Sequence, residues 1–188
     1  MTTSLLVLLM FTGIISIGIG NILMAFASMV AEFKPFRDYQ LGVLWLLILL
    51  ESYLSMFWNC VLLAERETWE FITFLYVIAG PVILLFASSL MTKLLTHDEP
   101  GGPEIRMQEE IVITRFFWLF AVSQLWTLGI EFLLGLEWSY ASLVSVMVAG
   151  IAALLAIFKQ RNLRWYFTLA VVSLMVADIY IQSAGIHL

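Results

Sequence analysis

Acidic and amide side chains lie within long apolar stretches of the sequence, where they could bind protons or cations. The first set falls in residues 41–63 and comprises Glu51, Ser55, Trp58 and Asn59. Their spacing of i, i+4, i+7 and i+8 places them on one face of a helix. A charged carboxylate in the middle of a bilayer costs at least ~2.5–3.5 kcal/mol, so we expect Glu51 to be protonated, paired or in contact with water.

Two later apolar stretches carry polar side chains of the same kind. One contains Gln124, Thr127 and Glu131, and the other contains Asp178 and Gln182 one turn apart. The spacing again places each set on one helix face. If the three faces meet, they line an acidic cavity that opens to the outside and favours protons or small cations.

A structural role is the alternative for each of these carboxyl groups. In that case Glu51 is a neutral acid that hydrogen-bonds to a side chain of a neighbouring helix and holds the bundle together. Asp178 falls slightly outward of the membrane midplane, and Glu131 falls near the outer boundary, where a solvated carboxylate costs little. The residue types alone leave both roles open.

The inventory of reactive side chains argues against a cofactor. His97 and His187 lie outside the apolar stretches, so they cannot supply the two axial ligands of a haem within the bilayer. The lysines lie in links or at helix ends, which excludes a buried Schiff base. Cys60 with two distant histidines does not make a zinc site, and no catalytic motif occurs. We therefore expect no cofactor, no metal and no enzymatic activity.

The composition is that of a protein embedded in a lipid bilayer. Of 188 residues, 62% are apolar or aromatic and 12% are Asp, Glu, Lys or Arg, whereas a soluble domain has about a quarter of its residues charged. The 9 Lys and Arg residues against 14 Asp and Glu residues argue against a nucleic-acid binder, and the single Cys argues against a disulfide-stapled fold. Lipid is therefore the expected partner.

Six apolar stretches are long enough to cross the hydrocarbon core, which takes about 20 residues. They cover approximately residues 4–31, 41–63, 70–91, 111–135, 139–158 and 165–186. The sequence thus predicts an all-α polytopic membrane protein with six transmembrane helices in a single domain, residues 1–188. The link 92–110 would separate halves 1–91 and 111–188.

The distribution of basic residues predicts the orientation. The links after the first, third and fifth stretches, with the flanking helix ends, contain nearly all of the Lys and Arg residues, and the opposite side contains Arg66. These residues are Lys34, Arg37, Lys93, Arg106, Arg115, Lys159, Arg161 and Arg164. Because cytoplasmic loops are enriched in Lys and Arg, both termini are expected outside the cytoplasm.

Two segments could have a mechanical or recognition role. The link 92–110 is rich in Pro, Gly and acidic residues, which is typical of a solvated tether, and the alternative is a docking loop for a cytoplasmic partner. Gly80 and Pro81 interrupt the backbone hydrogen bonding of the third stretch. They predict a kink, which is either a static bend or a gating hinge.

Small residues predict close approach between helices. Gly13, Ser16 and Gly20 form one flat face in the first stretch. A second set lies in the fifth stretch and comprises Ser142, Ser145, Ala149, Ala153 and Ala156. Such faces serve either packing within the chain or the contact of a homo-oligomer.

Three features of the N-terminal half stand out: the segment Gly13-Ile-Ile-Ser-Ile-Gly-Ile-Gly20, Trp45 and the stretch from Trp69 to Ser89. With these features the chain resembles a group of six-span bacterial inner-membrane proteins of no known activity. The resemblance implies a multi-pass protein of the bacterial inner membrane, and it implies no site residues.

Two functions follow from these patterns. The first is a proton or small-cation channel, transporter or sensor that uses the carboxyl-lined interior described above. The second is a non-transporting membrane scaffold or effector subunit that binds a partner protein, in which the buried acids only hold the helices together.

Overall fold

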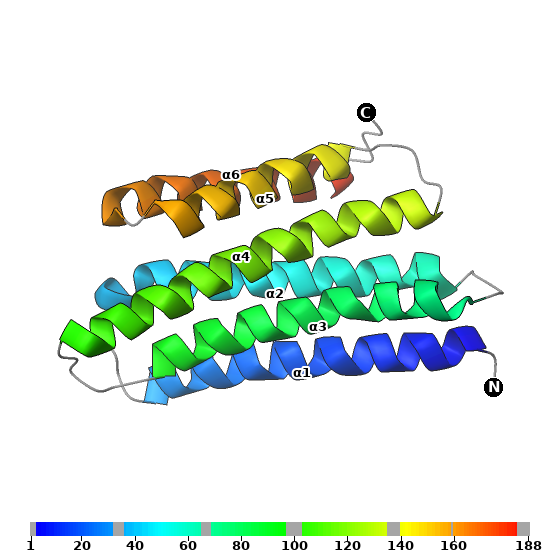
Figure 1. Ribbon diagram of the computed structural model, residues 1–188, viewed down its shortest axis with the longest axis horizontal. Coiled ribbons are helices and arrows are strands. Elements are labelled where there is room, and N and C mark those ends of the chain that lie inside the picture. The colour runs from blue at the N-terminus through cyan, green and yellow to red at the C-terminus, as the bar shows by residue number, and fades with distance from the viewer. Residues whose placement is uncertain are drawn as a thin grey trace. The chain divides into compact units, whose positions relative to one another are not determined.

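The computed structural model describes residues 3–31, 36–64, 69–96, 103–134, 140–158 and 160–183. All regular secondary structure in these ranges is α-helical (Figure 1). The six helices are α1 (Thr3–Ala31), α2 (Phe36–Ala64), α3 (Phe71–Thr96), α4 (Pro103–Leu134), α5 (Tyr140–Ile157) and α6 (Arg161–Ser183). They form two compact units, Met1–Pro100 and Gly101–Leu188, which are described one at a time.

Five of the helices are long and apolar enough to cross a membrane, which confirms an all-α polytopic membrane protein. The candidate spans are Ser4–Ala31, Gln40–Trp58, Phe71–Thr96, Glu109–Ile130 and Asn162–Tyr180. In α5 the apolar segment Ser142–Ile157 is shorter than the roughly 20 residues that a perpendicular span needs. The crossing of the bilayer by α5 therefore stays a prediction.

The helices extend further into the link 92–110 than hydropathy predicted. Helix α3 continues to Thr96, and α4 begins at Pro103. Proline suits the first position of a helix, because its fixed φ is already helical and its missing N–H would have no partner there. Hydropathy marks only the part of a helix that matches the membrane, so it does not detect the helical residues at the two ends of the link 92–110. Residues 97–102 lie outside the described ranges.

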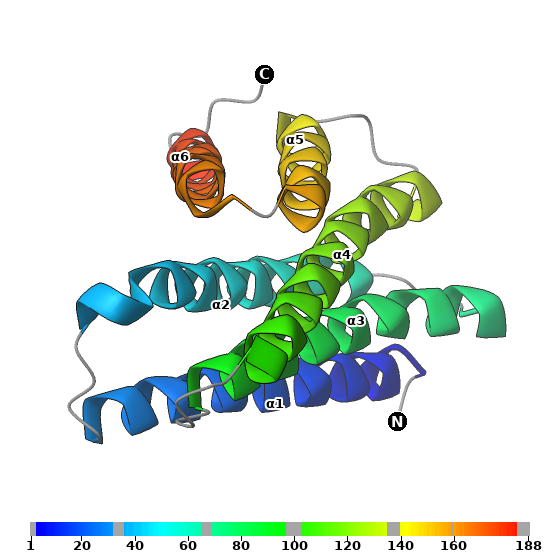
Figure 2. The ribbon, with the colours of Figure 1, turned by 60° about the vertical axis from the view of Figure 1, so that its left-hand side comes forward.

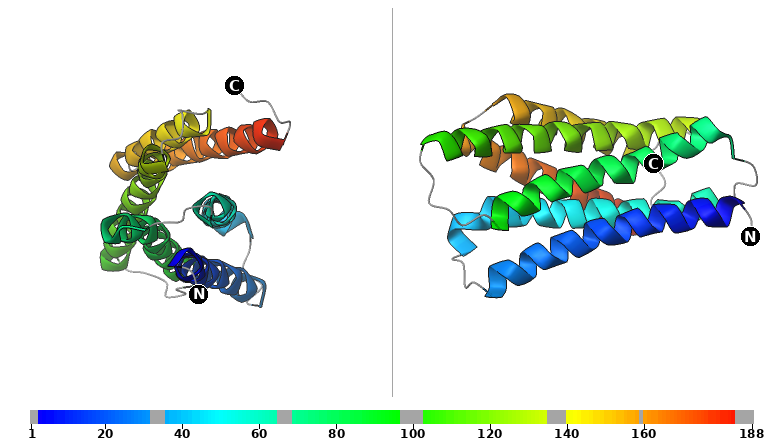
Figure 3. Two further views of the ribbon diagram at one scale, coloured as in Figure 1. Left: turned by 90° about the vertical axis from the view of Figure 1, so that its right-hand side faces the viewer. Right: turned by 60° about the horizontal axis from the view of Figure 1, so that its bottom comes forward.

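Unit 1 is a three-helix bundle in which α1 packs on both α2 and α3, and α2 packs on α3. The helices run lengthwise along one another (Figure 3). A single stripe of α1 faces this core, with successive members three or four residues apart as one helix face requires. The stripe comprises Val7, Phe11, Ile15, Gly18, Ile22, Ala25 and Met29.

The three helices of unit 1 meet at Gly18, Tyr53 and Ser88. The Tyr53 side chain of α2 is fully buried, and its hydroxyl oxygen lies 3.0 Å from Ser88 Oγ of α3 in a hydrogen bond. A Cβ atom added at Gly18 of α1 would overlap the Tyr53 ring. Glycine is therefore required here to leave room for the phenol. We call these three residues the tyrosine node.

Further contacts join the ends of the same helices. At one end, the Trp69 indole N–H donates to Ser4 Oγ at 3.3 Å, which ties the start of α1 to the segment before α3. At the other end, a Cβ at Gly42 of α2 would overlap Leu95 of α3. Among the glycines of unit 1, Gly18 and Gly42 thus lie where another helix approaches closely.

The predicted small-residue face of α1 is not the face that packs. Gly13 and Ser16 are exposed, and an added Cβ at Gly13 or Gly20 would meet no atom within 4 Å. Their spacing is correct for one helix face, but the buried apolar residues of α1 lie on the opposite side and face α2 and α3. The contact of a second copy at Gly13, Ser16 and Gly20 stays a prediction.

Helix α3 runs through Pro81 without a break in its helical assignment. Gly80 and Pro81 are both buried. Neighbouring helices can compensate the hydrogen bond that proline removes, which explains why proline is tolerated in membrane helices. A gating role for this pair stays a prediction.

Unit 2 is organised around α5, which packs on α4 and on α6. Figure 2 shows α5 and α6 side by side, nearly end-on, with α4 inclined to both. Of the small residues predicted on α5, Ser142, Ala149 and Ala156 are buried, together with Ala152, which was not predicted, whereas Ser145 and Ala153 are half-buried. The buried face of α4 contributes the phenyl rings of Phe116, Phe117 and Phe120.

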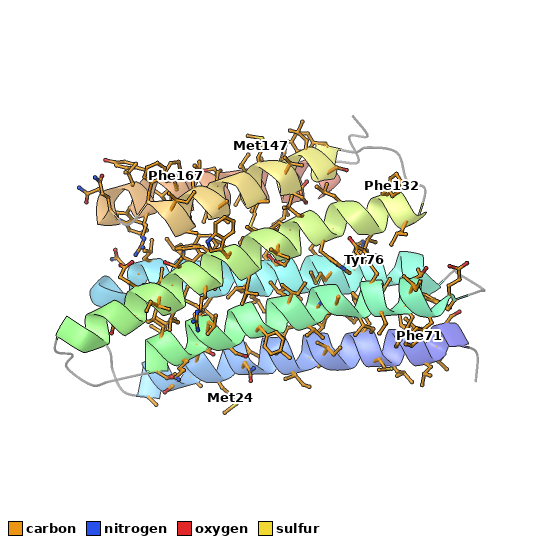
Figure 4. All side chains as sticks on the ribbon, viewed as in Figure 1. Met24, Phe71, Tyr76, Phe132, Met147 and Phe167 are labelled. Carbon is orange, nitrogen blue, oxygen red and sulfur yellow. The ribbon has the colours of Figure 1, made fainter. Side chains whose placement is uncertain are left out.

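Large apolar side chains cover the outside of both units. Met24 of α1 is 73% exposed, Phe71 of α3 is 73% exposed, and Phe132 of α4 is 82% exposed; Met147 of α5 also projects outward (Figure 4). In water such surfaces would drive aggregation, whereas lipid chains cover them at no cost. This is the pattern expected for helices in a bilayer.

Adding a methyl group at Gly18 should destabilise unit 1. Gly18→Ala forces the buried Tyr53 ring to move, and overpacking of this kind costs about 1–3 kcal/mol. The matched control is Gly13→Ala, which adds the same methyl group to an exposed position of the same helix. Unfolding of the purified protein in mixed micelles measures both. Equal stability of the two variants would show that the Tyr53 ring does not depend on Gly18.

The hydrogen bond of the tyrosine node should contribute modestly to stability. Tyr53→Phe removes the hydroxyl but keeps the ring, and Ser88 Oγ still donates to Leu85 O at 3.0 Å. We expect a loss of about 0.5–1.5 kcal/mol. A double-mutant cycle with Ser88→Ala isolates the pair, and a coupling energy of zero would refute the contact.

Candidate functional site

The polar stripe predicted on α2 lies at the edge of the helix face that packs in unit 1. The centre of that face includes Leu49, Ser52 and Tyr53, which are buried. Glu51 is half-buried, whereas Ser55 is exposed. The side chain of Asn59 lies outside the described residues. The structure therefore turns Ser55 away from the core and leaves Glu51 at the boundary between core and surface.

In α4 the described residues of the predicted polar set are buried or half-buried, and one of them forms a hydrogen bond within its own helix. Gln124 is buried and Thr127 is half-buried, and the Thr127 hydroxyl donates to the carbonyl oxygen of Gln124. The buried Ser123, which the sequence did not single out, donates to Phe120 O at 2.7 Å. The side chain of Glu131 lies outside the described residues.

In α6 the predicted acid lies in the half of the helix that is less buried. Asp178 is half-buried, and no residue of the segment 172–180 is fully buried. The side chain of Gln182 lies outside the described residues. Closer to the start of the helix, Thr168 is fully buried and donates to Arg164 O at 2.7 Å.

The predicted site residues are distributed over both units. Glu51 belongs to unit 1, whereas Gln124, Thr127 and Asp178 belong to unit 2. Because each unit is described by itself, the shared acidic cavity stays a prediction. Among the described residues, no group of three His, Cys, Asp or Glu side chains is arranged to hold a metal ion.

In unit 2, an ion pair joins α4 and α6. Arg164 Nη1 donates to Glu110 Oε1 at 3.0 Å, and Nη2 donates to Oε2 at 2.8 Å. The Arg164 side chain is 7% exposed and the Glu110 side chain is 36% exposed. This two-pronged geometry fixes both side chains and makes the hydrogen bonds strong.

Both partners of the ion pair lie at the start of a candidate span. The span of α4 begins at Glu109 and that of α6 begins at Asn162, so Glu110 and Arg164 fall at the predicted cytoplasmic boundary. A buried guanidinium needs a compensating charge. Glu110 supplies this charge and accepts hydrogen bonds from both Nη atoms of Arg164. Arg164 Nε has no hydrogen-bond partner among the described residues.

Sequence reasoning missed this pair because it used each residue for a different purpose. Arg164 was counted with the basic residues that set the orientation, and Glu110 was assigned to the acidic link 92–110. One signal was available: each residue immediately precedes a predicted apolar stretch, 111–135 or 165–186, and the two stretches are predicted to start on the same side of the membrane. Their pairing still required the tertiary packing of α4, α5 and α6.

Loss of the ion pair should destabilise unit 2. Glu110→Gln leaves a buried guanidinium without its counter-charge, and we expect a loss of roughly 1–2 kcal/mol, below the range for fully buried pairs because Glu110 is partly solvated. The neighbouring exposed Glu109 provides the matched control, Glu109→Gln. Thermal unfolding in detergent measures both variants. The interpretation fails if the two variants melt at the same temperature.

The chain matches no family model, no curated protein and no solved structure. The resemblance of its N-terminal half to six-span bacterial membrane proteins therefore stays a prediction.

Proposed function

We propose that this multi-pass membrane protein conducts or senses protons or small cations, and that Glu51 and Asp178 are the groups that bind them. The observation that carries this proposal is that both carboxyl groups lie within candidate membrane spans, Gln40–Trp58 and Asn162–Tyr180, and that both are half-buried. An ionisable residue inside a span is costly to insert. Its presence on two separate spans supports a functional role.

The chemistry of the neighbouring residues is compatible with this role. Gln124 is buried in α4, and its amide has both a donor and an acceptor that can form hydrogen bonds with water or with a protonated acid. Proton relays in membrane proteins use chains of ionisable side chains such as Asp, Glu and His. In this proposal Glu51 and Asp178 alternate between protonated and charged states as the cation or proton passes.

The proposal includes the orientation and setting expected from the sequence. All six helices, α5 included, cross the inner membrane of a bacterium, and both termini lie outside the cytoplasm. The Arg164–Glu110 pair then lies at the cytoplasmic boundary, where basic residues are favoured. Glu51 lies near the middle of its span, and Asp178 lies toward the outer side.

A second candidate, the non-transporting scaffold or effector subunit, is favoured by a different observation. The Ser55 and Trp58 side chains are exposed and do not face the core of unit 1, so this part of the stripe is presented to the surroundings. A partner helix or a second copy would then contact this part of α2, and a cytoplasmic protein would bind residues 92–110. This candidate predicts no ion flux.

Flux measurements in proteoliposomes distinguish the two candidates. The wild-type protein should carry a proton or alkali-cation current above that of empty liposomes. Glu51→Gln and Asp178→Asn should each lower it at least about tenfold, which corresponds to ~1.4 kcal/mol on the barrier. Both substitutions remove the charge and nearly conserve the shape of the side chain.

The matched control is Glu70→Gln, an exposed acid just before α3. It should leave the flux unchanged, and circular dichroism and gel filtration should show that all variants fold alike. Absence of flux with folded wild-type protein rejects transport and supports the scaffold candidate. Unchanged flux in both carboxyl variants would remove Glu51 and Asp178 from the pathway.

A further inference from the structure

Helices α4 and α6 are connected across α5 rather than packed on each other. In the part of unit 2 that the structure describes, the helix backbones that lie in contact are α4 with α5 and α5 with α6. The Arg164 side chain nevertheless reaches Glu110 of α4 with both of its Nη atoms. A long side chain thus spans a gap that the backbones leave open.

The burial of α6 is uneven along its length. Its buried residues, among those that the structure describes, are Arg164, Thr168 and Val171, all in the first half of the helix. Beyond Val171 the described side chains are half-buried or exposed. The first half of α6, toward the predicted cytoplasmic end, is therefore its more deeply buried half.

We propose that Arg164 and Glu110 form a cytoplasmic latch, an ion pair whose opening lets the start of α6 move away from α4. The two partners are unequally accessible, since Arg164 is enclosed while about a third of the Glu110 side chain is exposed. Opening therefore begins at Glu110, where water or a cation can compete for the carboxylate. The latch is independent of whether the protein conducts ions.

The physical basis is a side-chain contact that substitutes for helix packing. Packed helices separate only when many van der Waals contacts are lost together. A contact between two side chains has two discrete states, paired and apart, and the enclosed guanidinium strongly favours the paired state. Such a two-state element at the end of a helix is what a conformational switch requires.

Distances between spin labels test the latch in the full-length protein in lipid nanodiscs. In a Cys60→Ser background, one label pair is placed at exposed positions beside the latch, Ile111→Cys and Asn162→Cys. Glu110→Gln should lengthen the mean label distance by roughly 2 Å or more and broaden its distribution, as expected for a helix shift. Glu109→Gln should leave the distribution as in the wild type.

A second label pair locates the movement. Leu125→Cys and Val176→Cys lie on exposed positions of α4 and α6 away from the latch, and their distance should change less than the first. If Glu110→Gln does not fold, Arg164→Lys replaces it, because lysine keeps the charge but loses the two-pronged pairing. An unchanged first distance in a folded variant overturns the latch, and so does an equal change in both distances.

Discussion

Hydrocarbon offers no hydrogen bonds to a polar group, and this constraint governs where each polar side chain of the protein is placed. The hydroxyls of Ser52, Ser123 and Thr168 meet it locally, because each donates to a carbonyl oxygen three or four residues earlier in its own helix. Tyr53 and Arg164 meet it by reaching another helix. Local bonds make a polar residue tolerable within a helix, whereas the longer ones also determine which helices are joined.

The same environment changes what brings helices together. Lipid chains are as apolar as leucine, so burial of apolar area gives little preference for helix contact over lipid contact, and close fit decides instead. In unit 1 the absence of a side chain at Gly18 admits the Tyr53 ring, and the absence at Gly42 admits Leu95. In unit 2 the alanines of α5 serve the same purpose. Each unit thus combines a steric fit with a polar contact between helices, Tyr53 with Ser88 in unit 1 and Arg164 with Glu110 in unit 2.

The sequence was sufficient to choose candidate site residues by their chemical type, but it did not show what surrounds each of them in the fold. It selected Glu51 and Asp178 because a carboxyl in a span stands out against an apolar background, and both are half-buried on membrane-length helices. It placed Ser55 with Glu51 because periodicity defines a shared face, but periodicity does not say whether that face meets the core or the surroundings. It overlooked Glu110 because a residue at the edge of an apolar stretch resembles the adjoining link.

The sequence by itself determined that the chain is all-α and membrane-embedded, because long apolar runs and scarce charge leave a helix with internal backbone hydrogen bonds as the stable form in lipid. Those signals are local, since each depends on residues that are close in the chain. Only the tertiary structure decided that Gly18 rather than Gly13 faces a neighbour, that Tyr53 pairs with Ser88, and that Arg164 pairs with Glu110. These contacts join residues that are far apart in the sequence, and their energies depend on the rotation and register of whole helices, which no local pattern of residues specifies.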